Sequence, residues 1–417
     1  MRHISRRDFL HLSTRAAAGG VFLPGLHRIA PALAGAQGPD ADGRILVVIE
    51  LSGGNDGLNT VVPLADDAYA KARPTLAVPA KAALRLDDAF GLHPELQRLR
   101  ALWDDGQLAV VHGVGYPQPN RSHFASMDIW HSADPGGGLR RSGWLGRTLA
   151  ANAGGHARAL PGMQVGGELS LAMRPEHGQV PSISGPESLL LRTDPRSGQD
   201  AAAELRTIPA LSAFPRGEDE AAALRCAREA FAAACAEGER LRRLAAGYTP
   251  AVAYEGGLGQ RLGFVARMID ARTPARIYYT STGGYDTHAS QEGAHNNLHR
   301  GFARALGDFL RDLAEHGHRD RVAVLVFSEF GRRVAENGSR GTDHGTAGPV
   351  FLAGFPVRGG LYGTHPSLTD LDQGDLKFTT DFRSVYASVL RGWLRASDAS
   401  ILGAEYPSLP LFRGRVV

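Results

Sequence analysis

Long apolar runs recur along the chain, and each ends in a polar, glycine-rich segment. Four of them have the length of strands: "RILVVIEL" (44–51), "LAVVHGVG" (108–115), "ARIYYTST" (275–282) and "RVAVLVFSEF" (321–330). Their apolar character is continuous and does not alternate with polar residues. This pattern predicts strands that are buried on both faces, as in a parallel sheet covered by helices.

Segments with helical spacing of apolar residues lie between these runs. They cover residues 93–105, 220–246, 259–271 and 296–317. The alternation of strand and helix predicts an α/β protein, a three-layer αβα sandwich around a mostly parallel sheet. We expect one domain over residues 37–417, with an irregular insertion at about 150–215, where glycine, proline and serine are frequent and no long periodic segment occurs.

The first 36 residues have the composition of an export signal. Arg6 and Arg7 precede a weakly apolar stretch, and small residues stand at Ala32 and Ala34. The paired arginines predict a twin-arginine signal peptide over 1–36, with the export machinery as a partner and the periplasm, secretion or the cell surface as destination. A basic amphipathic helix is the alternative interpretation. Because the apolar stretch contains Arg15, we expect no permanent membrane span.

The net charge of the chain argues against one class of partner. The chain has 46 basic and 43 acidic residues, and its net charge is +3. Such a balance gives no electrostatic preference for nucleic acid. We therefore expect no nucleic-acid partner.

Polar residues with metal-binding side chains follow the predicted strands. In a parallel sheet the loops after the strands converge at one edge, where ligands bind. Carboxylates and imidazoles that arrive there on separate loops are the donors a divalent metal needs, and a hydroxyl at a helix start can act as a nucleophile or bind an anion. The residues are Asp56, Ser122 with His123, Asp286 with His288, Glu329, and Asp343 with His344.

Most of these residues also have a purely structural explanation. Asp56 lies in "GGNDGLN", which favours a tight turn by itself, and Ser122 has the position of a helix cap. Glu329 can pair with Arg332 or Arg333. Adjacent Asp343 and His344 between glycine-rich residues are harder to explain as a turn alone.

A second histidine arrangement lies outside these loops. His295 and His299 are four residues apart and would share one helix face. They could bind zinc together with His288, although such a pair at a polar helix start is usually solvated.

Five ordered motifs carry a resemblance that spans the chain. They are "LSGGNDGLNTVVP", "YPQPNRSHFASMDIW", "GGYDTHASQ", "SEFGRRVAENGSRGTDHG" and "TTDFRSVYASVL". Together they resemble the bacterial DUF1501 family, exported proteins of unknown biochemical role. That family is similar to the alkaline phosphatase-like superfamily of phosphatases, sulfatases and phosphoglycerate mutases.

The superfamily resemblance implies an exported hydrolase of phosphate or sulfate esters that acts on a small anionic ester. It also implies a divalent metal ion (zinc, manganese or calcium) and a serine nucleophile. Ser122 would attack the ester, and Arg332 or Arg121 would hold its anionic oxygens. The implied metal ligands are Asp56, Asp286, His288, Glu329, Asp343 and His344.

The sequence departs from the superfamily pattern in ways that leave alternatives open. Asp286 and His288 are only two residues apart, which is closer than usual. Either Glu329 or Asp343 is the metal ligand that follows the fourth predicted strand. The final histidine ligand of the superfamily pattern corresponds to His365 or to His123. Such departures also fit a non-catalytic envelope binding or accessory protein that keeps the fold without the metals.

Overall fold

The computed structural model describes residues 43–136, 141–151, 162–177, 180–184, 243 and 246–414. The predicted signal peptide at 1–36 and nearly all of the helix expected over 220–246 lie outside these residues. The elements described below belong to one compact unit, formed by residues 38–185 and 247–417.

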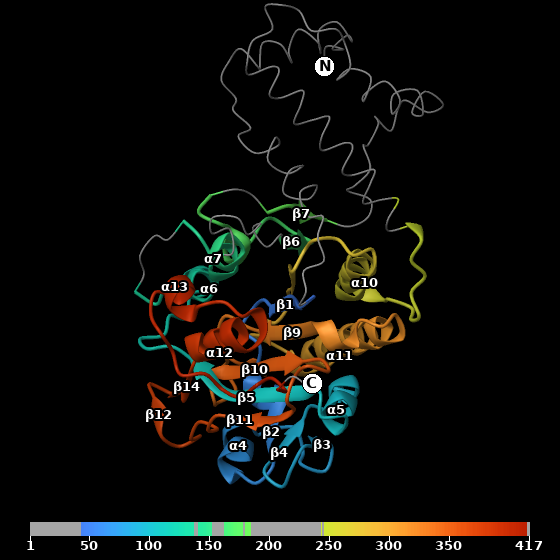
Figure 1. Ribbon diagram of the computed structural model, residues 1–417. Coiled ribbons are helices and arrows are strands. Elements are labelled where there is room, and N and C mark those ends of the chain that lie inside the picture. Colours follow the sequence, from blue (N-terminus) through green and yellow to red (C-terminus); the bar gives the residue numbers. More distant parts are fainter. Residues whose placement is uncertain are drawn as a thin grey trace, which may run out of the picture. The chain divides into compact units, whose positions relative to one another are not determined.

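The described residues build a central sheet of nine strands (Figure 1). The four strands predicted from the apolar runs are among them. The bounds are β1 Ile45–Leu51, β5 Leu108–Gly115, β6 Gly162–Val165, β7 Ser182–Ile183, β8 Ile277–Thr282, β9 Val322–Phe327, β10 Gly348–Ala353, β11 Gly360–Tyr362 and β14 Thr380–Asp381.

The order across the sheet is β11-β5-β10-β9-β1-β8-β6-β7, and β14 pairs with β5. The pairs β1 with β8, β1 with β9 and β6 with β8 are parallel. Strand β10 is antiparallel to both β5 and β9. The predicted mostly parallel sheet is therefore confirmed, with one reversed strand in its middle.

Helices cover both faces of the sheet (Figure 1). On one face, Trp130, Trp144 and Phe382 pack against the strand residues Val48 and Leu325. The helices α5, α10 and α11 pack together and form the other layer. The helix bounds are α5 Gln97–Asp104, α6 His123–Ser132, α7 Trp144–Ala151, α10 Gly256–Asp270, α11 Gln291–Glu315, α12 Phe382–Val389 and α13 Asp398–Leu402.

Two smaller sheets and two short helices complete the described elements near the site. They are the sheet of β2 Val61–Pro63, β4 Phe90–Leu92 and β3 Leu84–Arg85, the pair β12 Leu371–Asp372 and β13 Asp375–Leu376, and the helices α3 Gly57–Thr60 and α4 Asp67–Ala72.

Part of the segment expected to be an irregular insertion belongs to the sheet. Strand β6 runs parallel to β8, and β7 pairs with β6. These strands are too short to give the long periodic signal on which the expectation rested. The rest of 150–215 lies mainly outside the described residues.

The reversed strand β10 decides where the site forms. Because β10 is antiparallel to its neighbours, its first residue, Gly348, lies beside Val114 near the carboxyl end of β5. The chain just before β10 therefore lies at the same edge as the loops that leave β1, β5, β8 and β9. That preceding segment carries Asp343 and His344.

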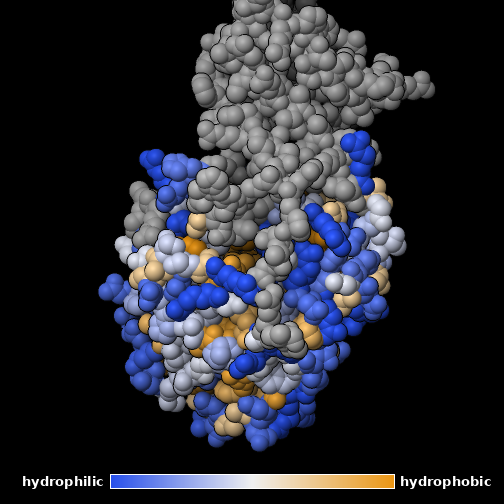
Figure 2. Space-filling view, in the orientation of Figure 1, coloured by the Kyte–Doolittle hydropathy of each residue, from blue (hydrophilic) through white to orange (hydrophobic). Residues whose placement is uncertain are grey.

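The described surface is largely polar. The face in Figure 2 is mostly hydrophilic, with smaller hydrophobic areas between the polar residues. Among the described helices, none has the length and apolar character needed to cross a bilayer.

Candidate functional site

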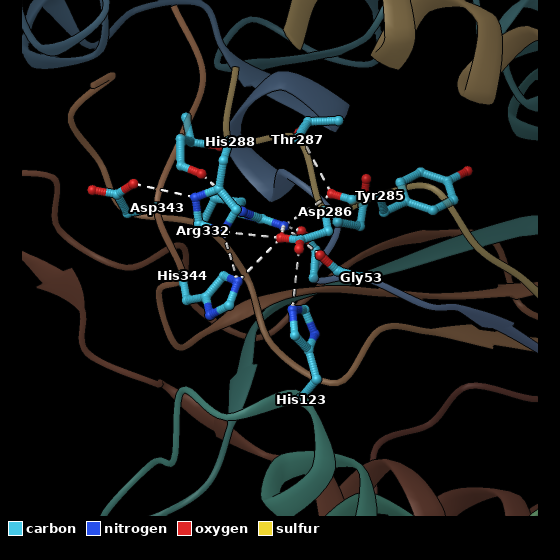
Figure 3. A network of polar contacts seen from close by, with 12 residues as sticks. Gly53, His123, Tyr285, Asp286, Thr287, His288, Arg332, Asp343 and His344 are labelled. Atoms are coloured by element: carbon cyan, nitrogen blue, oxygen red, sulfur yellow. Dashed lines mark hydrogen bonds and ion pairs between the residues drawn. The ribbon is translucent and has the colours of Figure 1, made fainter. Parts of the chain in front are cut away.

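The carboxylate of Asp286 is the centre of the site (Figure 3). Asp286 follows β8, and imidazoles from three other positions surround it: His123 at the start of α6, His344 before β10, and His288 two residues further along its own loop. His344 Nε2 lies 3.1 Å and His288 Nε2 3.0 Å from Asp286 Oδ1. His123 Nε2 lies 3.6 Å from Asp286 Oδ2.

A hydrogen bond from Arg332 holds the carboxylate of Asp286 in place. Its Nη2 donates to Asp286 Oδ1 over 2.7 Å, and its side chain is fully buried. Partial burial acts to raise the pKa of Asp286, but the hydrogen bond from Arg332 and the neighbouring imidazoles outweigh it and hold this pKa at about 2. The carboxylate is therefore ionised at any physiological pH. Arg332 also donates to the backbone carbonyls of Gly53, Gly54, Tyr285 and Thr342.

Two imidazoles are oriented by acceptors on their far sides. His123 Nδ1 lies 2.8 Å from Oε1 of the buried Glu329. His344 Nδ1 lies 2.8 Å from the carbonyl oxygen of Arg121. The carboxylate of Asp286 is an acceptor too, so each ring lies between two oxygen acceptors, and a ring that keeps its proton on Nδ1 leaves Nε2 free to bind a cation.

His288 is held in the same way. Its Nδ1 lies 3.3 Å from Asp343 Oδ1, and Asn337 Nδ2 donates to that same oxygen over 3.0 Å. The hydrogen bond from Asn337 is the main reason why the pKa of Asp343 lies below its usual value. His288 Nε2 then lies 2.9 Å from His344 Nε2.

The arrangement fits a bound cation. One donor atom from each of His123, Asp286 and His344 lies within 4.8 Å of the others. Among the described residues, the buried Nε2 of His123 has no hydrogen-bond partner. Lone pairs that converge on a carboxylate repel it unless a proton or a metal ion lies between them. Imidazoles whose far nitrogens are held by carboxylates or carbonyls are the usual surroundings of a protein-bound metal.

Gly53 lets the loop after β1 approach this centre. Its φ is 121°, and a Cβ built on it would lie 2.5 Å from the backbone nitrogen of Asp286. Its N–H donates to Glu329 Oε1 over 2.8 Å. The glycines of "SGGNDG" thus serve a close backbone contact that supports Glu329 and Arg332.

Residues 44–390 match the family described as "Protein of unknown function (DUF1501)". This chain belongs to the DUF1501 family. The resemblance carried by the five motifs is therefore confirmed. No curated protein matches the sequence.

Solved structures similar to this DUF1501 chain include the following three. A protein in the alkaline phosphatase superfamily from Vibrio parahaemolyticus has 10% identity, with 97% of this chain and 77% of that chain covered and a TM-score of 0.34. The C-terminal periplasmic domain of EcEptC from Escherichia coli, in complex with Zn, has 10% identity, coverage of 74% and 72%, and a TM-score of 0.37. PsFucS1 sulfatase from Pseudoalteromonas sp. has 10% identity, coverage of 80% and 67%, and a TM-score of 0.33. Similarity this low assigns no role to any residue of the DUF1501 chain. The roles follow from the contacts and distances within the chain itself.

Asp56, one of the predicted ligands, lies outside the cluster around Asp286. Its Oδ2 pairs with Arg73 over 2.6 Å, and both side chains are fully buried. The same oxygen accepts a hydrogen bond from Gln291, and Oδ1 accepts the backbone N–H of Asn59 at the start of α3. Asp56 is thus a helix cap and a buried ion-pair partner.

Arg332, predicted to hold the anionic oxygens of the ester, lies beneath the cluster surface. Its guanidinium is buried and donates to four carbonyl oxygens and to Asp286, so it is not placed to contact a substrate. It acts as a positioning residue. Arg121 is partly exposed, but its guanidinium pairs with Asp375.

Glu329 and Asp343, the alternative ligands after the fourth predicted strand, both contact histidines of the site. Glu329 accepts from His123, and Asp343 accepts from His288. Each carboxylate lies behind an imidazole, on the side away from Asp286. Neither belongs to the three-residue group that surrounds a possible cation.

His123 is the histidine that joins the cluster. The sequence feature that indicates this position is that His123 directly follows Ser122, at the start of the helix after β5. His365 lies elsewhere, with its ring centroid 4.9 Å from that of Phe90 and 5.3 Å from that of His112.

Ser122 lies beside the cluster at the N-cap of α6. It is exposed, and its side chain makes no capping hydrogen bond. The structural alternative, in which this hydroxyl caps the helix, therefore does not describe what is seen. A nucleophilic role for Ser122 stays a prediction.

The histidine pair on α11 does not join His288. His295 Nε2 lies 3.2 Å from Asn55 Oδ1, and His299 Nε2 lies 3.1 Å from Thr60 Oγ1. Both rings are buried and contact His93, whose ring centroid is 4.9 Å from that of His299. They form a buried histidine cluster (His93, His295 and His299) inside the protein.

Proposed function

We propose that this protein is an exported, metal-dependent hydrolase of phosphate or sulfate esters. The observation that carries the proposal is the orientation of His123 and His344. Both rings have Nδ1 held by an oxygen acceptor and Nε2 directed at the ionised Asp286. This arrangement leaves Nε2 of both rings available to a cation beside an anionic carboxylate.

The donor set favours zinc or manganese over calcium. Imidazole nitrogens suit zinc and other transition metals, whereas calcium takes oxygen ligands almost entirely. His123, Asp286 and His344 would hold the ion, and His288 Nε2 would be a fourth donor. An ion held by these residues would supply Lewis-acid chemistry to a substrate oxygen.

A bound ion would polarise the ester and stabilise the negative charge that develops on its oxygens. The protein residues set up that chemistry in advance. Arg332 keeps Asp286 ionised and immobile, Glu329 fixes the ring of His123, and the Arg121 carbonyl fixes that of His344. Little rearrangement is then needed when substrate enters.

Ser122 is our proposed nucleophile. Its Oγ would form a bond to phosphorus or sulfur while the bond from that atom to the ester oxygen breaks, and the alcohol would leave with the serine proton. Water would then cleave the serine ester, releasing phosphate or sulfate and restoring the hydroxyl. Ser122 precedes the ligand His123 at the start of α6, where the helix dipole favours an anion.

A turnover assay with matched serine variants tests this function. Metal-loaded wild type, Ser122→Ala and Ser400→Ala would be screened against chromogenic phosphate and sulfate esters. Ser400 is exposed on α13, so its variant is the control. We expect Ser122→Ala to lower kcat by about 10³-fold and Ser400→Ala to leave it unchanged.

A different outcome would identify the alternative. Absence of metal-dependent turnover with every ester and every metal tested would contradict the proposal. The protein would then be a non-catalytic envelope binding or accessory protein.

A further inference from the structure

A pocket with an apolar floor lies next to the cluster. Its volume is about 340 Å³, within the range of small-molecule sites. Tyr116, Phe330 and Leu376 form buried parts of its lining, and Pro119 and Phe378 are exposed parts. We call this space the aromatic pocket.

The aromatic pocket is continuous with the cluster through shared segments. Phe330 lines the pocket, and its ring centroid lies 4.9 Å from that of His123 and 4.8 Å from that of His344. Asn120 also lines the pocket, and the carbonyl of the next residue, Arg121, holds His344. A ligand bound at the cluster can therefore extend into the pocket.

Two of the three charged residues of the lining are held in ion pairs. Asp375 is buried and pairs with Arg121 and with Arg333, the latter over 3.5 Å. Lys377 pairs with Asp370. The third, Asp372, is exposed and acidic. The pocket thus offers apolar contact, and its remaining charge repels a second anionic group.

One of the exposed aromatic side chains lines the aromatic pocket. Among the described residues, the large hydrophobic side chains that are exposed are Phe124, at 87%, and Phe378, at 37%. Phe378 lines the aromatic pocket, whereas Phe124 does not belong to its lining. An exposed aromatic ring at the mouth of an apolar pocket is a common means of binding a flat apolar ligand.

We propose that the aromatic pocket binds an uncharged aromatic group, the alcohol side of an ester whose anionic end faces His123, Asp286 and His344. This inference rests on the proposed function for the identity of the anionic end. The binding of the aromatic group itself depends only on the pocket.

Binding of 2-naphthol tests the pocket without catalysis. This uncharged probe would be titrated, by its fluorescence, into the metal-free full-length chain. We expect saturable binding to wild type, affinity about tenfold weaker for Phe378→Ser, and unchanged affinity for the matched control Phe124→Ser. No saturable binding, or equal affinity of wild type and Phe378→Ser, would overturn the inference.

Turnover separates this inference from the proposed function. The ratio of kcat/KM for 2-naphthyl phosphate to that for phenyl phosphate compares two leaving groups of similar acidity. We expect Phe378→Ser to lower this ratio about tenfold and Phe124→Ser to leave it unchanged. If 2-naphthol binding depends on Phe378 but no phosphate or sulfate ester is hydrolysed with any metal tested, the proposed function fails and the aromatic pocket stands.

Discussion

The buried guanidinium of Arg332 donates to the carboxylate of Asp286 over 2.7 Å and holds it at the point where three imidazoles converge. Arg332 is also bonded to the loops after β1 and β8 and to the segment before β10. One side chain therefore joins the loops of the site and sets the charge at its centre. This relationship makes the stability of the fold and the geometry of the cluster depend on each other.

Replacing Arg332 should destabilise the protein strongly. In Arg332→Gln, buried carbonyl oxygens and Asp286 lose their donor, so we expect the free energy of unfolding to fall by about 3–5 kcal/mol. Urea unfolding measures this change. Arg333→Gln is the control, because the Arg333 side chain is 36% exposed and its pair with Asp375 is longer, so we expect a loss of about 1 kcal/mol or less. Equal losses in the two variants would contradict the assignment.

Asp56→Asn should separate stability from metal binding. Asp56 neutralises the fully buried Arg73, so its loss leaves an unpaired charge and should cost about 3–5 kcal/mol. The metal content per folded chain should not change, because Asp56 lies outside the cluster. Asp66→Asn, at the exposed N-cap of α4, should leave both quantities unchanged, since asparagine caps helices as well as aspartate. A folded Asp56→Asn protein without metal would restore Asp56 as a ligand.

Glu329→Gln should weaken metal binding without abolishing it. Glu329 fixes the His123 ring from behind, and loss of such an outer carboxylate typically lowers metal affinity 10–100-fold. Competition with a chromophoric chelator measures the affinity. In the same assay, His123→Asn removes a direct ligand and should lose stoichiometric binding, while His177→Gln, at an exposed histidine, should match wild type. Complete loss of metal in Glu329→Gln would make Glu329 a ligand.

The buried histidine cluster predicts a loss of stability in mild acid. Burial lowers the pKa of His93, His295 and His299 below the usual 6.5. Between the folded pKa and 6.5 the unfolded chain binds more protons, so the stability contributed by these neutral rings is present above pH 6.5 and falls as the pH drops below it.

The variant His299→Gln measures how much of this pH dependence of stability comes from one of the three rings. We expect the slope of unfolding free energy against pH, below pH 6.5, to decrease by up to about 1.4 kcal/mol per pH unit. His177→Gln is the matched control, because that side chain is exposed and its slope should equal that of wild type. An unchanged slope in His299→Gln would show that the ring is already protonated in the folded protein.

Export has its own test. The signal peptide predicted over 1–36 depends on Arg6 and Arg7. Replacing both with lysine should retain the full-length precursor in the cytoplasm, as cell fractionation would show. Normal export of this variant would contradict a twin-arginine signal.

The four main strands and the residues at their ends could be predicted because both are local patterns. Continuous apolar runs identify buried strands, and polar residues after them occupy the carboxyl edge. Asp286 and His288 were found in this way. The reversal of β10 could not be predicted, because its antiparallel pairing with β5 and β9 depends on contacts between distant parts of the chain. That reversal is what brings Asp343 and His344 to the edge.

The roles within the site were harder to assign for the same reason. Asp56 and Asp286 have the same local signature, an acid after a strand and a glycine. Only the tertiary partners distinguish them: Arg73 neutralises Asp56 away from the histidines, whereas Asp286 has imidazoles around it. The sequence around Glu329 likewise does not distinguish it from a ligand, whereas its contact with His123 Nδ1 in the fold does.

Anomalous diffraction from crystals of the zinc- or manganese-loaded protein tests the central claim most directly. Our account predicts one anomalous peak about 2.0–2.2 Å from Nε2 of His123, Nε2 of His344 and an oxygen of Asp286. The same crystals should show His123 Nδ1 still bonded to Glu329. No peak at this position in crystals soaked with excess metal, or a peak bound by other residues, would contradict it.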